Sequence, residues 1–202
     1  IPIAERTGLI AEIDAWVLHQ ACAQMCEWLK AGVDLSVVAV NVSSRLFARR
    51  ELFQQVAQVL HDTGLDPAFL ELEVTESAVM EDPEVALEQM HRLRELGLRL
   101  AIDDFGTGYS SLLRLKRLPV QKLKIDQGFV AGLPWDEDDA AIVRVIIALA
   151  QSMGMQVHAE GVEQVEQAAF LLDHDCDLGQ GYWFGKPVPA PMLDWANRPQ
   201  IP

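Results

Sequence analysis

Two adjacent aspartates, Asp103 and Asp104, lie between a short apolar run and a glycine-rich turn in the segment R-L-A-I-D-D-F-G-T-G-Y-S-S at residues 99–111. The apolar run predicts a strand that is buried on both faces of a parallel sheet. Two carboxylates at the end of such a strand repel each other and are costly to desolvate, so a divalent cation with oxygen ligands is favoured between them. An aspartate N-cap followed by a glycine turn is the alternative.

Polar side chains occur at or just after the end of every predicted strand. They are Asn41, Glu73, Glu76, Asp103, Asp104, Lys124, Asp126, Glu160, Glu163 and Gln180. The carboxyl ends of parallel strands meet on one rim, where barrel enzymes place their active sites. Amide and carboxylate oxygens suit Mg²⁺ or Mn²⁺, and Asp103 could bridge two ions about 3.5–4 Å apart. Two such ions hold the attacking and leaving oxygens of a phosphate ester in line, so the set predicts metal-dependent hydrolysis of a phosphodiester.

Lys124 adds a positive charge to this set, in the sequence K-I-D at residues 124–126. Its ammonium group could stabilise a developing oxyanion or orient the attacking water. Taken alone, the same three residues are also typical of a buried ion pair. The oxygen donors at the other strand ends favour the catalytic interpretation.

Strands and helices alternate along the chain. The predicted strands are residues 35–42, 69–74, 99–103, 122–125, 156–159 and 177–179, and the predicted helices are about twenty residues before Gly32, then 50–62, 82–96, 138–153, 164–173 and a short tail helix after Pro191. This order predicts an α/β protein, a TIM-like (β/α) barrel. Because a typical barrel has eight strands and about 250 residues, we expect about two strands and ~50 residues upstream of Ile1. An open doubly wound sheet is the alternative, but no Gly-rich phosphate loop follows the first strand.

Composition narrows the choice of partner and compartment. The net charge of −14 argues against binding a nucleic-acid polymer. It is compatible with a small anionic ligand that is bound through metal ions. No apolar run is long enough to span a membrane, and the three cysteines indicate a reducing compartment. His19, Cys22 and Cys26 have helical spacing, which we interpret as the core stripe of an amphipathic helix because no second pair of ligands follows at zinc spacing.

Seven motifs carry the resemblance to a known family. They are I-P-I-A-E-R-T-G-L-I at residues 1–10, V-N-V-S at 40–43, E-V-T-E at 73–76, D-D-F-G-T-G-Y-S-S at 103–111, K-I-D at 124–126, A-E-G-V-E at 159–163 and Q-G-Y at 180–182, with K-P close behind. In this order they resemble the EAL domain, the bacterial family of cyclic di-GMP-specific phosphodiesterases. Residues 1–202 are therefore expected to be an EAL domain that lacks its first ~50 residues, among them the Glu-Ala-Leu signature.

The resemblance implies a two-metal site that opens the cyclic dinucleotide with water to give linear pGpG. The implied ligands of Mg²⁺ or Mn²⁺ are Asn41, Glu73 and Asp103 for one ion, and Asp103 and Asp104 for the other. Glu160 would bind the second ion or act as the general base, and Lys124 would contact the nucleophilic water. The signature glutamate, a further ligand, is not in this chain.

The remaining implied roles concern the loops around the metals. Glu76 would anchor the loop at residues 105–111, while Glu163 and Asp126 would support the site from behind the ligands. The implied substrate-binding residues are Gln180, Phe105, Gly106, Thr107, Gly108, Ser110 and Pro187.

Two activities are compatible with this family. The first is a cyclic di-GMP phosphodiesterase, and the second is an inactive receptor that keeps the pocket and has lost the chemistry. Degenerate members usually lose metal ligands or the loop sequence, and every such position contained in this chain is intact, which favours the enzyme. The isolated 202 residues are expected to have little or no activity, because the signature glutamate and part of the barrel wall are missing.

The resemblance also implies partners and a location. We expect a homodimer formed near the loop after the two aspartates and the helix that follows K-I-D. Sensory or diguanylate-cyclase domains are expected in the same parent chain. The location is cytoplasmic, either free or as the cytoplasmic domain of a membrane-anchored protein.

Overall fold

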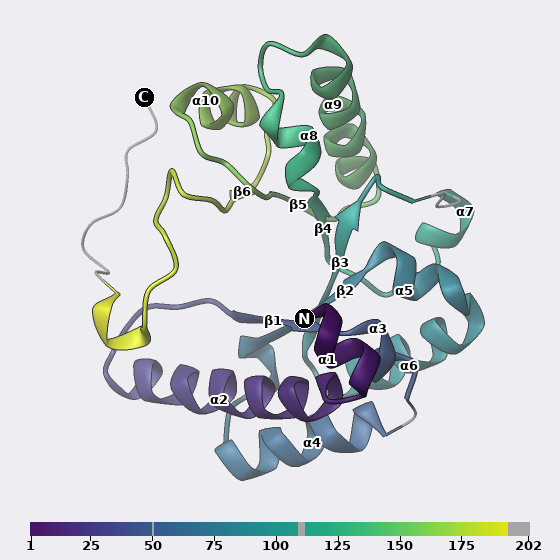
Figure 1. Ribbon diagram of the computed structural model, residues 1–202, viewed down its shortest axis with the longest axis vertical. Coiled ribbons are helices and arrows are strands. Elements are labelled where there is room, and N and C mark those ends of the chain that lie inside the picture. The colour runs from purple at the N-terminus through teal and green to yellow at the C-terminus, as the bar shows by residue number, and fades with distance from the viewer. Residues whose placement is uncertain (50, 109–111, 194–202) are drawn as a thin grey trace. The chain divides into compact units, whose positions relative to one another are not determined.

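The computed structural model describes residues 1–49, 51–108 and 112–193 (Figure 1). The chain consists of two compact units. Among the described residues, the first unit contains residues 1–102 and 112–120. The second contains residues 103–108 and 121–193. Strand β3 therefore contributes residues to both units.

Six strands in the described residues form a sheet whose order follows the chain. They are β1 (Val38–Val42), β2 (Leu70–Thr75), β3 (Arg99–Phe105), β4 (Lys122–Ile125), β5 (Gln156–Ala159) and β6 (Leu178–Gly179). β1 pairs in parallel with β2, β4 with β5, and β5 with β6. The expected α/β class is confirmed, and β4 and β5 have the predicted bounds.

The described helices connect these strands (Figure 1). They are α1 (Pro2–Thr7), α2 (Ile10–Lys30), α3 (Ser44–Phe47), α4 (Leu52–Thr63), α5 (Glu76–Glu81), α6 (Pro83–Glu95), α7 (Leu112–Leu115), α8 (Gln127–Ala131), α9 (Glu137–Ser152) and α10 (Val165–Asp173), with 3₁₀ turns η1 (Pro67–Phe69) and η2 (Ala190–Met192). The tail helix predicted after Pro191 falls largely outside the described residues. None of the helices described is both long and apolar enough to cross a membrane.

Three short helices begin directly after a strand, and a side chain caps each of them. The hydroxyl of Ser43 accepts a hydrogen bond from the Leu46 amide before α3, and the hydroxyl of Thr75 accepts one from the Ala78 amide before α5. The carboxylate of Asp126 accepts one from the Gly128 amide before α8. These caps satisfy backbone amides that have no partner inside the helix. A helix can therefore begin directly after β1, β2 and β4.

Strand β3 is longer than the sequence predicts and includes both aspartates. The prediction that the strand ends at Asp103 is wrong by two residues, because the buried side chain of Phe105 keeps the chain in the sheet. Gly106 then adopts a φ of 101°. A Cβ at that position would lie 2.9 Å from the Phe129 ring, so only glycine fits the turn.

In the first unit, α2 packs against α4 and β1. Cys22 is fully buried on α2, whereas Cys26 is half-buried and His19 is exposed. The thiol of Cys26 donates a hydrogen bond to the carbonyl oxygen of Thr63. Cys22 thus belongs to the core, and the three side chains do not share one buried face.

In the second unit, α9 packs against α8, β4 and β5. Its buried face carries Val143, Ile146, Ile147 and Ala150, at the spacing of an amphipathic helix. The carboxylate of Asp136 accepts hydrogen bonds from the amides of Asp138 and Asp139 and starts this helix. The helix holds the two strands whose ends carry Lys124 and Glu160.

The thiol of Cys22 is expected to react slowly with alkylating reagents in the folded protein. Burial, reinforced by Cys26, raises the pKa of Cys22 from 9.0 to about 11, which lowers its thiolate fraction at pH 8 about 100-fold. Iodoacetamide labelling followed by mass spectrometry checks this, with protein unfolded in urea as the control. Equal labelling rates for folded and unfolded Cys22 would contradict it.

Candidate active site and metal centre

Neighbouring strands of the first unit carry an amide and a carboxylate, Asn41 and Glu73. Asn41 on β1 is in register with Glu73 on β2. Residues in register on parallel strands project from the same face of the sheet, so the two side chains extend to the same side. Glu73 is 4% exposed and Asn41 is exposed. The pair supplies oxygen donors at the carboxyl end of the sheet, as predicted.

The two aspartates of β3 are crowded by negative charge. Asp103 is 7% exposed, and its Oδ1 accepts a hydrogen bond from the backbone amide of Asp104 at 3.0 Å. Asp104 has a φ of 54°, a left-handed conformation that is uncommon outside glycine. Burial raises the pKa of Asp104, and the carboxylates of Asp103, Asp126 and Glu160 raise it further. A cation bound among these groups would relieve the repulsion.

Lys124 lies between two carboxylates of the second unit. Its Nζ is 3.1 Å from Oδ1 of Asp103 and 2.5 Å from Oε1 of Glu160. The side chain is 2% exposed, so the ammonium group is held in an environment where its charge is poorly screened. Lys124 does form a buried ion pair, and its partners are two of the predicted metal ligands.

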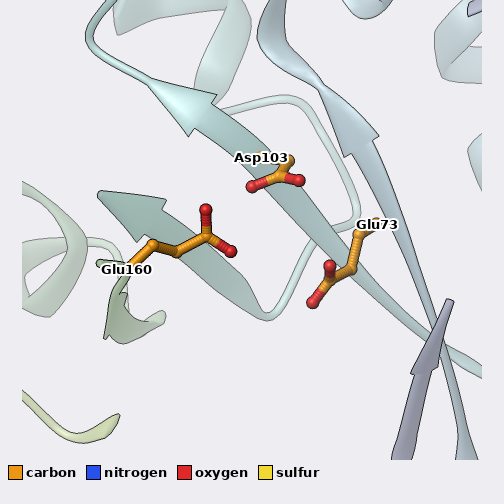
Figure 2. A group of neighbouring side chains, drawn as sticks. All are labelled: Glu73, Asp103 and Glu160. Carbon is orange, nitrogen blue, oxygen red and sulfur yellow. The ribbon is translucent and has the colours of Figure 1, made fainter. Parts of the chain in front are cut away.

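Three carboxylates could together hold a metal ion. Glu73, Asp103 and Glu160 each offer one oxygen, and these oxygens all lie within 4.8 Å of one another (Figure 2). The donors come from β2, from β3 and from the residue that follows β5. A set made only of carboxylate oxygens suits a hard divalent ion such as Mg²⁺ or Mn²⁺ better than zinc.

His158 on β5 is in register with Lys124 on β4. Burial, together with the charges of Lys122 and Lys124, lowers the pKa of His158 from 6.5 to about 4. The ring is therefore neutral near pH 7 and adds no positive charge beside Lys124. His158 is thus an uncharged residue of the strand.

The other predicted supporting and substrate-binding residues lie on α5 and in the loops that follow β5 and β6. Glu76 is the first residue of α5 and is buried, and Glu163 is exposed in the loop before α10. Gln180 is exposed directly after β6, and its backbone amide donates a hydrogen bond to the carbonyl oxygen of Ala159 at 2.8 Å. Pro187 is exposed as well. The anchoring of the loop after β3 by Glu76 stays a prediction.

The loop after β3 is described only in part. The hydroxyl of Thr107 donates a hydrogen bond to the carbonyl oxygen of Asp104 at 2.8 Å, and Gly106 and Gly108 are exposed. Phe105 is buried, so its side chain packs in the core and does not face solvent. Ser110 lies outside the described residues.

Sequence reasoning missed a further buried charge on each of two strands. Glu71 precedes Glu73 on β2 and Lys122 precedes Lys124 on β4 by two residues, so each projects from the same face of its own strand as the later residue. Both are buried, and both take part in interactions with other residues. The alternation of charged and apolar residues in E-L-E-V and K-L-K-I is the signal that could have found them.

The chain is similar to proteins of a known family. The EAL domain family model matches residues 1–187. The bifunctional diguanylate cyclase/cyclic di-GMP phosphodiesterase MucR of Pseudomonas aeruginosa is 47% identical over 193 residues, which are 96% of this chain and 28% of that protein. The cyclic di-GMP phosphodiesterase NbdA of the same organism is 44% identical over 194 residues, 96% of this chain and 25% of that protein. The chain thus spans about a quarter of the length of these relatives.

A solved structure gives the same result for the fold. The PaMucR phosphodiesterase, determined as a cyclic di-GMP complex, is 48% identical, with a TM-score of 0.91 over 94% of this chain and 77% of that chain. This similarity confirms the expected TIM-like α/β fold. Because the family model covers most of the sequence and the relatives match nearly all of it, this chain belongs to the EAL domain family.

Proposed function

We propose that this chain is the catalytic domain of a phosphodiesterase that hydrolyses cyclic di-GMP to linear pGpG. The observation that carries the proposal is the Lys124 ammonium group held between the carboxylates of Asp103 and Glu160. The names of MucR and NbdA, which state this activity for those proteins, support it. Every metal ligand that the resemblance implies within this chain is present, which supports an enzyme over a receptor.

The proposed cofactor is a pair of Mg²⁺ or Mn²⁺ ions. Asn41, Glu73 and Asp103 would hold one ion, and Asp103 with Asp104 would hold the other, with Glu160 beside it. When bound, such ions stabilise negative charge on phosphoryl oxygens and lower the pKa of water. Burial and the neighbouring carboxylates of Asp103, Asp126 and Glu160 raise the pKa of Asp104, and this crowding of negative charge supports the assignment.

The protein's own groups would then carry out the remaining steps. Glu160 accepts a proton from the attacking water while the oxygen of that water forms a bond to phosphorus. The bond from phosphorus to the 3′ oxygen breaks, and that oxygen takes up a proton, so one water is consumed for each ring opened. Lys124 keeps the Glu160 carboxylate in place and offsets the negative charge that develops on the phosphoryl group. Gln180 and the loop after β3 would hold the dinucleotide.

Incubation of the full-length protein with cyclic di-GMP and Mg²⁺ or Mn²⁺ tests the activity. We expect linear pGpG, separated by liquid chromatography, and we expect EDTA to stop its formation. Intact dinucleotide that nevertheless binds to the protein would contradict the enzyme and support the receptor. Calorimetric titration with Mn²⁺ tests the metal site separately.

We further propose that the parent protein carries sensory or diguanylate-cyclase domains and acts in the cytoplasm, free or anchored to a membrane. The double activity in the name of MucR supports the domain partner. Cyclic dinucleotides are charged and do not cross lipid bilayers unaided, which supports a cytoplasmic site of action.

A homodimer through α9 is the proposed assembly. The outer surface of the second unit exposes Trp135 and Val145, at 66% and 67%, together with Ile142. Large apolar side chains that are exposed gain free energy when a partner buries them. Val145→Asp is expected to shift the protein from dimer to monomer in analytical ultracentrifugation, whereas Val85→Asp on α6 is not. A wild-type protein that sediments as a monomer at micromolar concentration would contradict this.

A further inference from the structure

Gln167 on α10 uses both ends of its side-chain amide to join two segments of the second unit. Its Oε1 accepts hydrogen bonds from the backbone amides of Glu163, at 2.8 Å, and Gln164, at 3.0 Å. Its Nε2 donates to the carbonyl oxygens of Val130, at 3.1 Å, and Ala131, at 3.4 Å. The residue is 3% exposed, so water cannot readily replace these bonds.

The two joined segments follow, in the chain, the two partners of the ion pair between Lys124 and Glu160. Val130 and Ala131 end α8, the helix that follows Lys124 and its strand β4. The loop before α10 begins at Glu160, directly after β5. Gln167 therefore connects the backbone that follows Lys124 with the backbone that follows Glu160.

Gly161 gives an independent indication that this loop and α8 fit closely. Its φ is 68°, and a Cβ at this position would lie 2.6 Å from Cβ of Gln127, the first residue of α8. The backbone amide of Glu160 also donates a hydrogen bond to the carbonyl oxygen of Ile125 at 3.1 Å. The loop thus lies against the last residue of β4 at Glu160 and against α8 at Gly161, and Gln167 joins the end of the loop to the end of α8.

We propose that Gln167 is a positioning residue that keeps Glu160 against Lys124. The amide of Glu160 still bonds to Ile125 of β4, but Glu160 follows the last residue of β5, so the direction of its side chain depends on the loop that begins there. Loss of the Gln167 bonds would leave two buried carbonyl groups and two amides to find other partners, and the loop would move away from α8. The 2.5 Å contact between Oε1 of Glu160 and Nζ of Lys124 would then be lost.

A double-variant cycle without metal tests this placement directly. Urea unfolding in EDTA is measured for Gln167→Met, which keeps the side-chain volume, for Glu160→Gln, and for the two combined. Gln167→Met already separates Glu160 from Lys124, so Glu160→Gln should destabilise that variant less than it destabilises the wild type. We therefore expect the combined change in the unfolding constant to be about fivefold smaller than the product of the two single changes. Leu171→Ala, a buried change on the same helix, should combine with Glu160→Gln multiplicatively. A multiplicative result for Gln167→Met would overturn the proposal.

A second variant keeps the test valid if Gln167→Met does not fold. Gln167→Glu retains an oxygen that accepts from Glu163 and Gln164 and loses the donor to the end of α8. It should show the same shortfall in the cycle, and a multiplicative result would again overturn the proposal.

The catalytic consequence rests on the proposed function and is measured in the full-length protein. Gln167→Met is expected to lower kcat for cyclic di-GMP about tenfold with little change in KM, and Leu171→Ala to change neither by more than about twofold. Equal losses for both variants would mean a general loss of stability and would overturn the positioning role. If the wild-type protein does not hydrolyse cyclic di-GMP, the proposed function fails, and the cycle in EDTA still decides the role of Gln167.

Discussion

Glu160→Gln is expected to lower kcat for cyclic di-GMP about 10³-fold, with a much smaller effect on KM. The amide cannot accept the proton of the attacking water, and it removes one of the carboxylates that could hold a metal ion. It also removes the negative partner that lies 2.5 Å from Nζ of Lys124. Steady-state kinetics at saturating Mn²⁺, with pGpG measured by liquid chromatography, gives the two constants separately.

The matched control for this variant is Glu166→Gln. Glu166 is an exposed glutamate in the first turn of α10, six positions along the chain from Glu160, and is not among the predicted site residues. Its replacement should leave kcat within about twofold of the wild-type value. Near-normal turnover by Glu160→Gln would show that another group takes the proton and would remove Glu160 from the proposed mechanism.

Lys124→Met is expected to reduce both stability and activity. The side chains of Lys124, Asp103 and Glu160 are all largely buried, so removal of the ammonium group leaves two carboxylates close together without a counter-charge. Breaking a buried ion pair by removal of one partner typically costs about 3–5 kcal/mol, and we expect a loss of that order in urea unfolding. Hydrolysis should fall about 10²-fold or more, because Glu160 loses its orientation.

Mn²⁺ provides a second readout for this variant. A divalent ion that binds the folded protein among these carboxylates should stabilise Lys124→Met as its concentration rises above Kd. Lys116→Met, which replaces an exposed lysine outside the site, is the control and should unfold like the wild type. A Lys124→Met protein as stable as the wild type in EDTA would show that the buried carboxylates do not need this ammonium group.

Much of the fold follows from local patterns in the chain. β4 and β5 have the predicted bounds because an acidic residue directly follows the last apolar residue of each strand, Asp126 after β4 and Glu160 after β5. The short helices α3, α5 and α8 were missed, because helices of four to six residues are too short for a repeating apolar pattern. β3 extends to Phe105 because that side chain is buried, which depends on its neighbours in space.

The sequence by itself determined the family, the parallel sheet and the identity of the oxygen donors at the strand ends. Parallel strands bring their carboxyl ends to one edge, so the position of a residue in its strand predicts the edge to which it belongs. The tertiary structure decided that Lys124 pairs with Asp103 and Glu160, that His158 is neutral, and that Gln167 joins the segments after β4 and β5. These features depend on distances of a few ångströms between segments far apart in the chain, and only packing sets such distances.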